Sequence, residues 1–219
     1  MFKKTIESLK TSRVISARQL NYLARKSYAH NRDVRLGTAE ILGIVSPTKE
    51  GAAILQRLLN DDDEIIAAEA CDSLSYTGDE SCIESLIDKL NSKSEMVRGY
   101  AATAIAQICT RTKCKIKESS DAIESCCVKE QSAWVQQNYF YSLYMLGQKQ
   151  LLEKLIAGYS SDSYHVRKAT IEMLKNCIED TPTSEAEIKK CIILSESLTD
   201  IESKQLLDEL FIGTQGENA

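Results

Sequence analysis

The stretch DVRLGTAEILG, residues 33–43, is one copy of a pattern that occurs five times along the chain. Each copy has an aliphatic anchor and a second aliphatic residue eight positions later, and four copies carry a small residue at the fourth position after the anchor. The anchors are spaced 32, 31, 38 and 31 residues apart, at Val34, Ile66, Val97, Val135 and Val166. A nearly fixed period in this range is typical of stacked supersecondary units, so the sequence predicts a solenoid.

The second copy shows what one unit contains. Apolar residues recur at helical spacing over 54–59, and Asn60 with three aspartates then interrupts the helix. Asn and Asp favour turns and helix N-termini because they bond to nearby backbone amides. A second helix follows with Ile66 and Leu74 on its buried side, and Gly78 is a suitable left-handed C-terminal cap. Neither helix can bury its apolar stripe alone, so neighbouring units must stack.

The pattern predicts an all-α fold, a right-handed α-solenoid of about five to six helix–turn–helix repeats. We expect a single domain over residues 1–213, with a disordered tail at 214–219. Both prolines fall between units, where a missing amide donor costs least. The expected repeats cover approximately 15–46, 49–78, 80–110, 117–147 and 149–178, with a degenerate C-terminal cap at 183–212.

Composition narrows the class of protein. The chain has 219 residues, of which 43% are apolar, and this is enough to bury a substantial core. No run of about 18 apolar residues occurs, so no membrane-spanning segment is predicted, and the basic start lacks the apolar region of a secretory signal. Most of the eight cysteines fall at apolar helical positions, which predicts reduced thiols and a cytoplasmic protein.

Charge is unevenly distributed along the chain. Residues 1–35 contain nine Lys and Arg against two acidic residues, a net charge of +7, whereas the remainder contains 18 against 30, a net charge of −12. A basic first repeat could meet an acidic partner, RNA or DNA, or could be a solvated surface. The sequence leaves these alternatives open.

The repeated pattern resembles a known family. Val34-Arg35 followed by small residues and Leu42 resembles a HEAT repeat, and the period near 31 is similar to the short HEAT-like class of phycobilisome-lyase-type proteins. The resemblance implies that the second helix of each unit lines a concave face. It also implies an inter-repeat ladder of turn Asp and helix Arg, which Arg35, Arg98 and Arg167 match and which Ala67 and Gln136 interrupt.

If the second helices line the concave face, helical periodicity predicts which positions are exposed there: one, two, five, six and nine after each anchor. Aromatic residues and Arg are the usual anchors of protein interfaces. The alternative for the aromatic cluster at 134–144 is that it packs the fourth unit against its neighbours. The expected partner-binding residues are Arg35, Arg98, Trp134, Gln137, Tyr141, Tyr144, Arg167 and Lys168.

No catalytic constellation is predicted. Glycine-rich phosphate loops are missing, and the two histidines, His30 and His165, belong to no triad signature. The chain also lacks the His-Glu dipeptide pair of the iron-binding HEAT-type hydroxylases. Four cysteines flank the basic loop at 111–117, but their spacing is not that of a zinc site. We therefore expect no catalytic residue, no cofactor and no metal.

The leading functional hypothesis is a non-enzymatic scaffold that binds a protein or peptide partner on the concave face. The alternative is a nucleic-acid-binding HEAT-like protein related to the DNA-alkylation-repair glycosylases. The faint similarity to that family rests on Trp134, Arg98, Arg167 and Lys168. Asn138 stands where that family has a carboxylate, and the net charge of −5 opposes phosphate binding. A third hypothesis is a lyase or chaperone subunit that holds a chromophore or a thiol substrate. The oligomeric state is left open.

Overall fold

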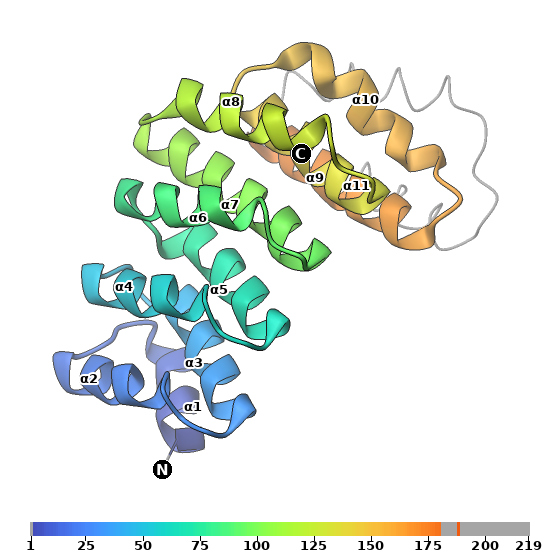
Figure 1. The fold of residues 1–219 in the computed structure, drawn as a ribbon. Helices are drawn as coiled ribbons and strands as arrows, with labels where there is room; N and C mark the ends of the chain where they lie inside the picture. Colours follow the sequence, from blue (N-terminus) through green and yellow to red (C-terminus); the bar gives the residue numbers. More distant parts are fainter. Residues whose placement is uncertain (1, 181–187, 189–219) are drawn as a thin grey trace, which may run out of the picture. The chain divides into compact units, whose positions relative to one another are not determined.

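A computed structural model describes residues 2–180 and residue 188. These residues form an all-α solenoid whose chain is almost entirely helix pairs (Figure 1). It divides into two compact units, residues 1–130 and 131–219, and each is described by itself. The single continuous domain stays a prediction.

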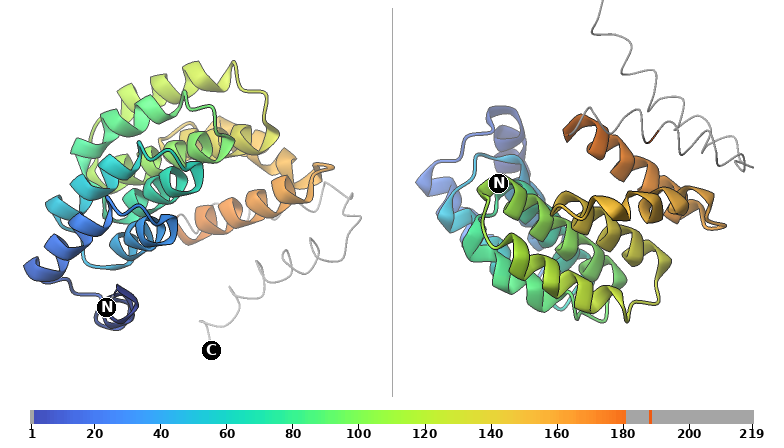
Figure 2. Two further views of the ribbon diagram at one scale, coloured as in Figure 1. Left: turned by 60° about the horizontal axis from the view of Figure 1, so that its bottom comes forward. Right: turned by 90° about the horizontal axis from the view of Figure 1, so that it is seen from above.

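The first unit contains eight of the helices described. Its first helices, α2, α4, α6 and α8, form one layer, and its second helices, α3, α5 and α7, form the other (Figures 1 and 2). The helix α1 precedes the first repeat, packs against α3, and was not predicted. The bounds are α1 Phe2–Ser12, α2 Ala17–Lys26, α3 Arg32–Ile44, α4 Lys49–Leu58, α5 Glu64–Thr77, α6 Ile83–Lys89, α7 Glu95–Thr112 and α8 Ile116–Cys127.

Polar side chains start these helices. Ser16 and Gln19 form a reciprocal capping box at the start of α2, and Asn31, Thr48 and Asp63 each accept a backbone amide at the starts of α3, α4 and α5. Such caps satisfy amides that have no partner inside the helix. The turn residues of the sequence pattern therefore begin helices as predicted.

The aliphatic residues eight positions after each anchor lie in the core. Leu42, Leu74 and Ile105 are at most 2% exposed, and they belong to α3, α5 and α7, which pack side by side. Gly43 lets α3 and α5 approach closely, because a Cβ atom there would lie 2.5 Å from Ser73 Oγ. The stacked second helices of the prediction are therefore present in this unit.

Gly78 corrects one detail of the prediction. It ends α5 with φ −72° and ψ 159°, which is extended backbone, so the expected left-handed cap is wrong. What favours glycine there is close packing: a Cβ atom would lie 2.6 Å from the Leu74 carbonyl oxygen and 3.0 Å from Ile108 Cδ1.

The second unit contains α9 Ala133–Met145, α10 Leu152–Ala157 and α11 Tyr164–Asp180 among its described residues. Its core combines Tyr141, Leu155 and Leu174 from the three helices with Tyr159 from the short 3-10 helix Gly158–Ser160 that follows α10. Except for Ile188, which is buried, the predicted C-terminal cap lies outside the described residues, as does the tail at 214–219. None of the helices within residues 2–180 is long and apolar enough to cross a bilayer.

Candidate protein-binding face

The arginines after the repeat anchors hold the turns of their own repeats. Arg35 Nη1 donates to the carbonyl oxygens of Ala29 and His30 at 2.9 and 3.1 Å. Arg98 Nη1 donates in the same way to Ser92 and Lys93 at 2.9 and 3.1 Å. These carbonyls lie in the turn between the two helices of a repeat, so the guanidinium fixes that turn.

Two of these arginines also bind a carboxylate in the next repeat. Arg35 makes a bidentate pair with Asp61 at 2.7 and 3.0 Å, and Arg98 makes one with Glu130 at 2.7 and 2.9 Å. The side chains of Asp61 and Glu130 are only 8% and 6% exposed. Burial raises the pKa of Asp61, but the hydrogen bonds from Arg35 and from the Asp63 amide outweigh it and lower the pKa.

The ladder implied by the family resemblance is therefore present in part. The arginine–carboxylate pairs link the first repeat to the second and the third repeat to the fourth. The ladder is interrupted between the second and third repeats, because Ala67 occupies the arginine position there. Lys89 Nζ instead reaches Asn60 Oδ1 at 2.7 Å between the second and third repeats. Most of the guanidinium donors of Arg35 and Arg98 are occupied by these contacts within the protein. A structural role therefore accounts for both arginines, and no role in binding another protein is needed to explain them.

The other predicted partner-binding residues lie in the second unit. Arg167 Nη1 donates to the carbonyls of Ser161 and Asp162 at 2.7 and 3.0 Å, which repeats the turn contact of Arg98. Lys168 is exposed, with its Nζ 4.0 Å from Glu172 one turn away, and Trp134 is half-buried. Their predicted role in binding stays a prediction.

The exposure predicted for three residues of α9 is wrong. Gln137, Tyr141 and Tyr144 are 7%, 1% and 3% exposed, and both tyrosines belong to the core of the second unit. The Lys149 ammonium also lies 3.9 Å from the centre of the Tyr144 ring. The offset of nine positions is buried on α5 and α7 as well, where Ser75 and Ala106 are 2% and 0% exposed, so the periodicity argument chose the wrong side of the second helices. The burial of both tyrosines agrees with the packing alternative for the cluster.

A different surface of the first unit is open to solvent, and we call it the second-helix face. Helix α5 contacts α3, α4 and α7, and its exposed or half-buried side carries residues spaced four, three and four apart. The matching residues of α7 follow 31 positions later, which is the repeat period. The second-helix face consists of Glu40 and Ile44 on α3, Ile65, Glu69, Asp72 and Tyr76 on α5, and Met96, Tyr100, Thr103 and Gln107 on α7.

Apolar and acidic side chains alternate on this face. Ile44, Ile65, Tyr76 and Met96 are 40%, 43%, 61% and 39% exposed, which is unusual for large apolar residues in one group. Between them lie three carboxylates, of which Glu69 and Asp72 are one helical turn apart on α5 and Glu40 is on α3. The face can therefore offer both apolar contacts and negative charge.

The electrostatics of these carboxylates differ from those of Asp61. Burial raises the pKa of Glu69, and the charges of Asp72 and Glu40 raise it further, while the Ser73 hydroxyl 3.3 Å away lowers it. Burial alone raises the pKa of Asp72. Burial raises the pKa of Tyr76 as well, and the charges of Asp72 and Glu69 add to this. The shifts of Glu69 and Tyr76 have the direction expected for negative charges confined together, and the shift of Asp72 has the direction expected for burial.

Neutralising Glu69 and Asp72 should stabilise the protein. A carboxyl group whose pKa is raised by folding destabilises the folded state when ionised, so stability falls as pH rises from the unfolded pKa through the folded one. We expect Glu69→Gln/Asp72→Asn to gain at least about 0.2–0.5 kcal/mol at pH 7, the size of a like-charge pair one turn apart on a helix. The gain should shrink as pH falls toward about 4, the ordinary pKa of a carboxyl group, because protonation removes the charges that repel one another.

Urea denaturation of wild type and variant at pH 4, 5.5 and 7 measures this difference. Asp88→Asn/Asp121→Asn is the matched control, because it removes two exposed carboxylates from the first-helix layer. A variant equal to wild type at pH 7 would show that the carboxylates of the face do not repel one another.

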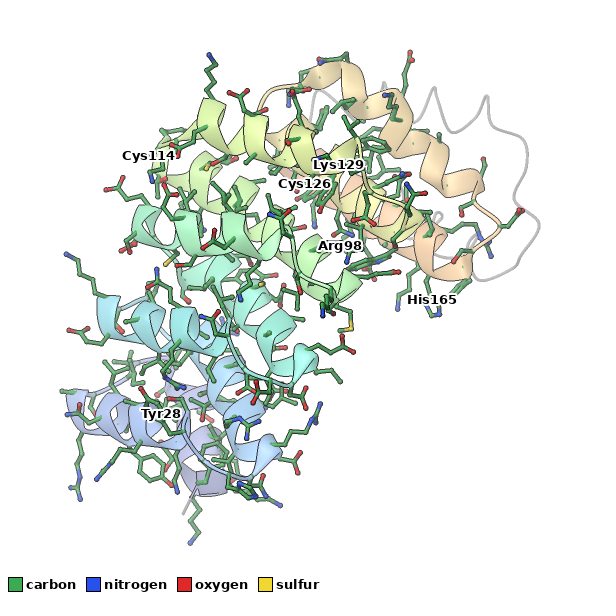
Figure 3. All side chains as sticks on the ribbon, viewed as in Figure 1. Tyr28, Arg98, Cys114, Cys126, Lys129 and His165 are labelled. Carbon is green, nitrogen blue, oxygen red and sulfur yellow. The ribbon has the colours of Figure 1, made fainter. Side chains whose placement is uncertain are left out.

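The cysteines within residues 2–180 do not form a cluster. Cys114 precedes α8 and Cys126 lies near its other end, as Figure 3 shows, while the Cys109 sulfur lies 3.2 Å from Ser119 Oγ. None of the seven cysteines in the described part of the chain forms a disulfide there. Within that part, no group of three or more His, Cys, Asp and Glu side chains is placed to hold a metal ion.

Comparison with known proteins identifies the repeats. A family model described as HEAT repeats matches residues 51–118 and 83–175, which together cover more than half of the chain. The sequence matches none of the curated proteins.

Solved structures share the fold at low sequence identity. The complex of CpcE and CpcF of phycocyanin lyase from Nostoc sp. PCC7120 matches with a TM-score of 0.63 and 16% identity, over 95% of this chain and 88% of that one. Two engineered proteins match with TM-scores of 0.47 and 0.46 at 18% and 20% identity. They cover 90% and 89% of this chain, and 96% and 58% of their own length.

Proposed function

Because the chain belongs to the HEAT-repeat family, we propose that it is a non-enzymatic scaffold that binds a partner protein on the second-helix face. The observation that carries this proposal is the group of exposed apolar side chains on α3, α5 and α7: Ile44, Ile65, Tyr76 and Met96. Exposed apolar groups of this kind mark interaction sites in soluble proteins. Phycocyanin lyase, whose structure has this fold, is an example in which one such chain forms a complex with a second protein.

This site replaces the aromatic one in the sequence-based hypothesis. Tyr141 and Tyr144 are buried, so truncating them would test the core of the second unit and not a surface. Ile65 and Met96, by contrast, are equivalent residues of adjacent repeats and are both exposed. A continuous surface across adjacent repeats is what solenoid proteins use to hold extended partners.

Substituting the apolar residues of the face should abolish partner capture. We expect Ile65→Asp/Met96→Asp to lose at least tenfold in recovery of the partner from a lysate of the native host, because interface anchors each contribute about 1 kcal/mol or more. Both residues lie in the first turns of α5 and α7, where an added carboxylate is compatible with the helix dipole. Folding should therefore be retained, and circular dichroism checks it.

The matched control is Val14→Asp/Val128→Asp. These two valines are also exposed, at 66% and 86%, but they lie outside the second-helix face. Equal recovery by wild type and Ile65→Asp/Met96→Asp, with both proteins folded, would refute the assignment of the face.

A second candidate function is binding of a polyanion such as nucleic acid by the first repeat. Arg18, Tyr22 and Arg25 follow one side of α2 and line a surface pocket of about 300 Å³ with Thr5 and Gln19. Within the described residues neither guanidinium group is hydrogen-bonded or ion-paired to another residue, so both can meet phosphates. This candidate is favoured if recovery of the partner from the lysate is lost on nuclease treatment or at rising salt, and is also lost with Arg18→Ala/Arg25→Ala.

We propose that the protein is cytoplasmic. The described cysteines form no disulfide among themselves, which is compatible with a reducing compartment. Burial raises the pKa of the Cys71 thiol to about 12, so this sulfur stays protonated and unreactive and serves as an apolar core atom.

A further inference from the structure

The acidic centre of the second-helix face identifies the chemistry of its partner. We propose that the face binds a segment of another protein that carries Lys or Arg side chains between apolar ones. The cationic groups sit against Glu40, Glu69 and Asp72, and the apolar groups sit at either end of α5. This inference rests on the proposed function and adds the class of partner to it.

The carboxylates of the face lack the cations that buried carboxylates have elsewhere in this unit. Asp61 and Glu130 each receive a bidentate arginine. Among the described residues, no lysine or arginine forms a salt bridge with Glu40, Glu69 or Asp72. Half-buried negative charge without a counter-charge destabilises the free protein, and a cation supplied by a partner removes that cost.

The arrangement and the charge of the carboxylates argue against a metal ion or a nucleic acid as the ligand of the second-helix face. The three carboxylates do not belong to any group placed to hold a metal ion within the described part of the chain. A phosphate backbone would be repelled by the same charges. Cationic side chains on a flexible partner can meet separate carboxylates one by one, so a protein segment fits best.

The apolar residues set the length and pattern of the segment. Ile65 and Tyr76 mark the two ends of the exposed side of α5, and they are about 16 Å apart along the helix axis. Glu69 and Asp72 lie between them. A helical segment of about 11 residues spans this distance, with apolar residues at its ends and basic residues in its middle. The partner is therefore a basic amphipathic segment.

Three synthetic peptides of about 14 residues test the proposal by fluorescence anisotropy at about 150 mM salt. The first combines Leu and Lys at amphipathic helical spacing, the second replaces each Lys by Glu, and the third replaces each Leu by Ser. We expect the Leu–Lys peptide alone to bind wild-type protein. Glu69→Gln/Asp72→Asn should weaken its binding at least tenfold, whereas Asp88→Asn/Asp121→Asn should leave it unchanged.

Two results would overturn the inference: equal binding of the Leu–Lys and Leu–Glu peptides, or an equal loss in both carboxylate variants. The second result would mean general attraction to a negative protein. The proposed function is judged separately. If Ile65→Asp/Met96→Asp loses the native partner while Glu69→Gln/Asp72→Asn keeps it, the face is a binding site whose partner is not basic.

Discussion

Leu74→Asp is expected to unfold the first unit. Leu74 is completely buried on α5, between α3 and α7, at the aliphatic position that the repeat pattern conserves along the chain. The substitution removes an apolar side chain from the core and buries a carboxylate without a partner. We expect a loss of more than about 4 kcal/mol, which is a large part of the total stability of a domain. Circular dichroism during urea denaturation measures it.

Ile65→Asp is the matched control for this prediction. It places the same new side chain on the same helix, nine residues earlier, at a position that is 43% exposed and in the first turn. A surface change of this kind is expected to stay within about 0.5 kcal/mol. Equal stability of the two variants would mean that the predicted alignment of the repeats is wrong.

Arg98→Ala is expected to be the most damaging change of a charged residue. It leaves the Glu130 carboxylate, which is 6% exposed, without its bidentate partner, and it frees the carbonyls of Ser92 and Lys93. Breaking a buried pair by removing one member costs about 3–5 kcal/mol, because the remaining charge stays desolvated. Thermal and urea denaturation should show the loss.

The double variant Arg98→Met/Glu130→Leu separates this cause from a general loss of packing. Removing both charges should recover much of the stability, since apolar replacements of buried ion pairs are often neutral. Arg18→Ala serves as the control, because Arg18 is exposed on α2. An Arg98→Ala protein as stable as Arg18→Ala would show that the inter-repeat pair contributes nothing to stability.

The residues of the ladder illustrate what a sequence pattern leaves undecided. The sequence pattern aligns the Val-Arg pairs of different repeats with one another. It does not show whether the arginine side chain points into a groove or bends back to the turn of its own repeat. Arg35 and Arg98 fold back because the carbonyls five and six positions earlier have no helical partner, and because Asp61 or Glu130 arrives from the next repeat. The distances of 26 and 32 residues to these carboxylates follow no fixed spacing, so the pairing could not be read from the repeat.

The second-helix face was detectable in part. Ile65 and Met96 each stand one position before their repeat anchor, and Glu69 and Tyr100 each stand three positions after it. The members of each pair are 31 residues apart, so this correspondence is visible in the sequence. An isoleucine before an anchor, however, looks the same whether it is buried or exposed. Its 43% exposure depends on which side of α5 is left free by its three neighbours.

The sequence by itself determined the helix pairs, their period and the buried aliphatic position, because these depend on local helical periodicity and on turn residues that bond their own backbone. The tertiary structure alone decided which side of each second helix is exposed. Tyr144 of α9 and Ser75 of α5, each nine positions after its anchor, are both buried, whereas Ile65 and Tyr76 on another side of α5 stay exposed. Burial results from packing between helices that are distant in sequence, and the pattern within one helix does not contain that information.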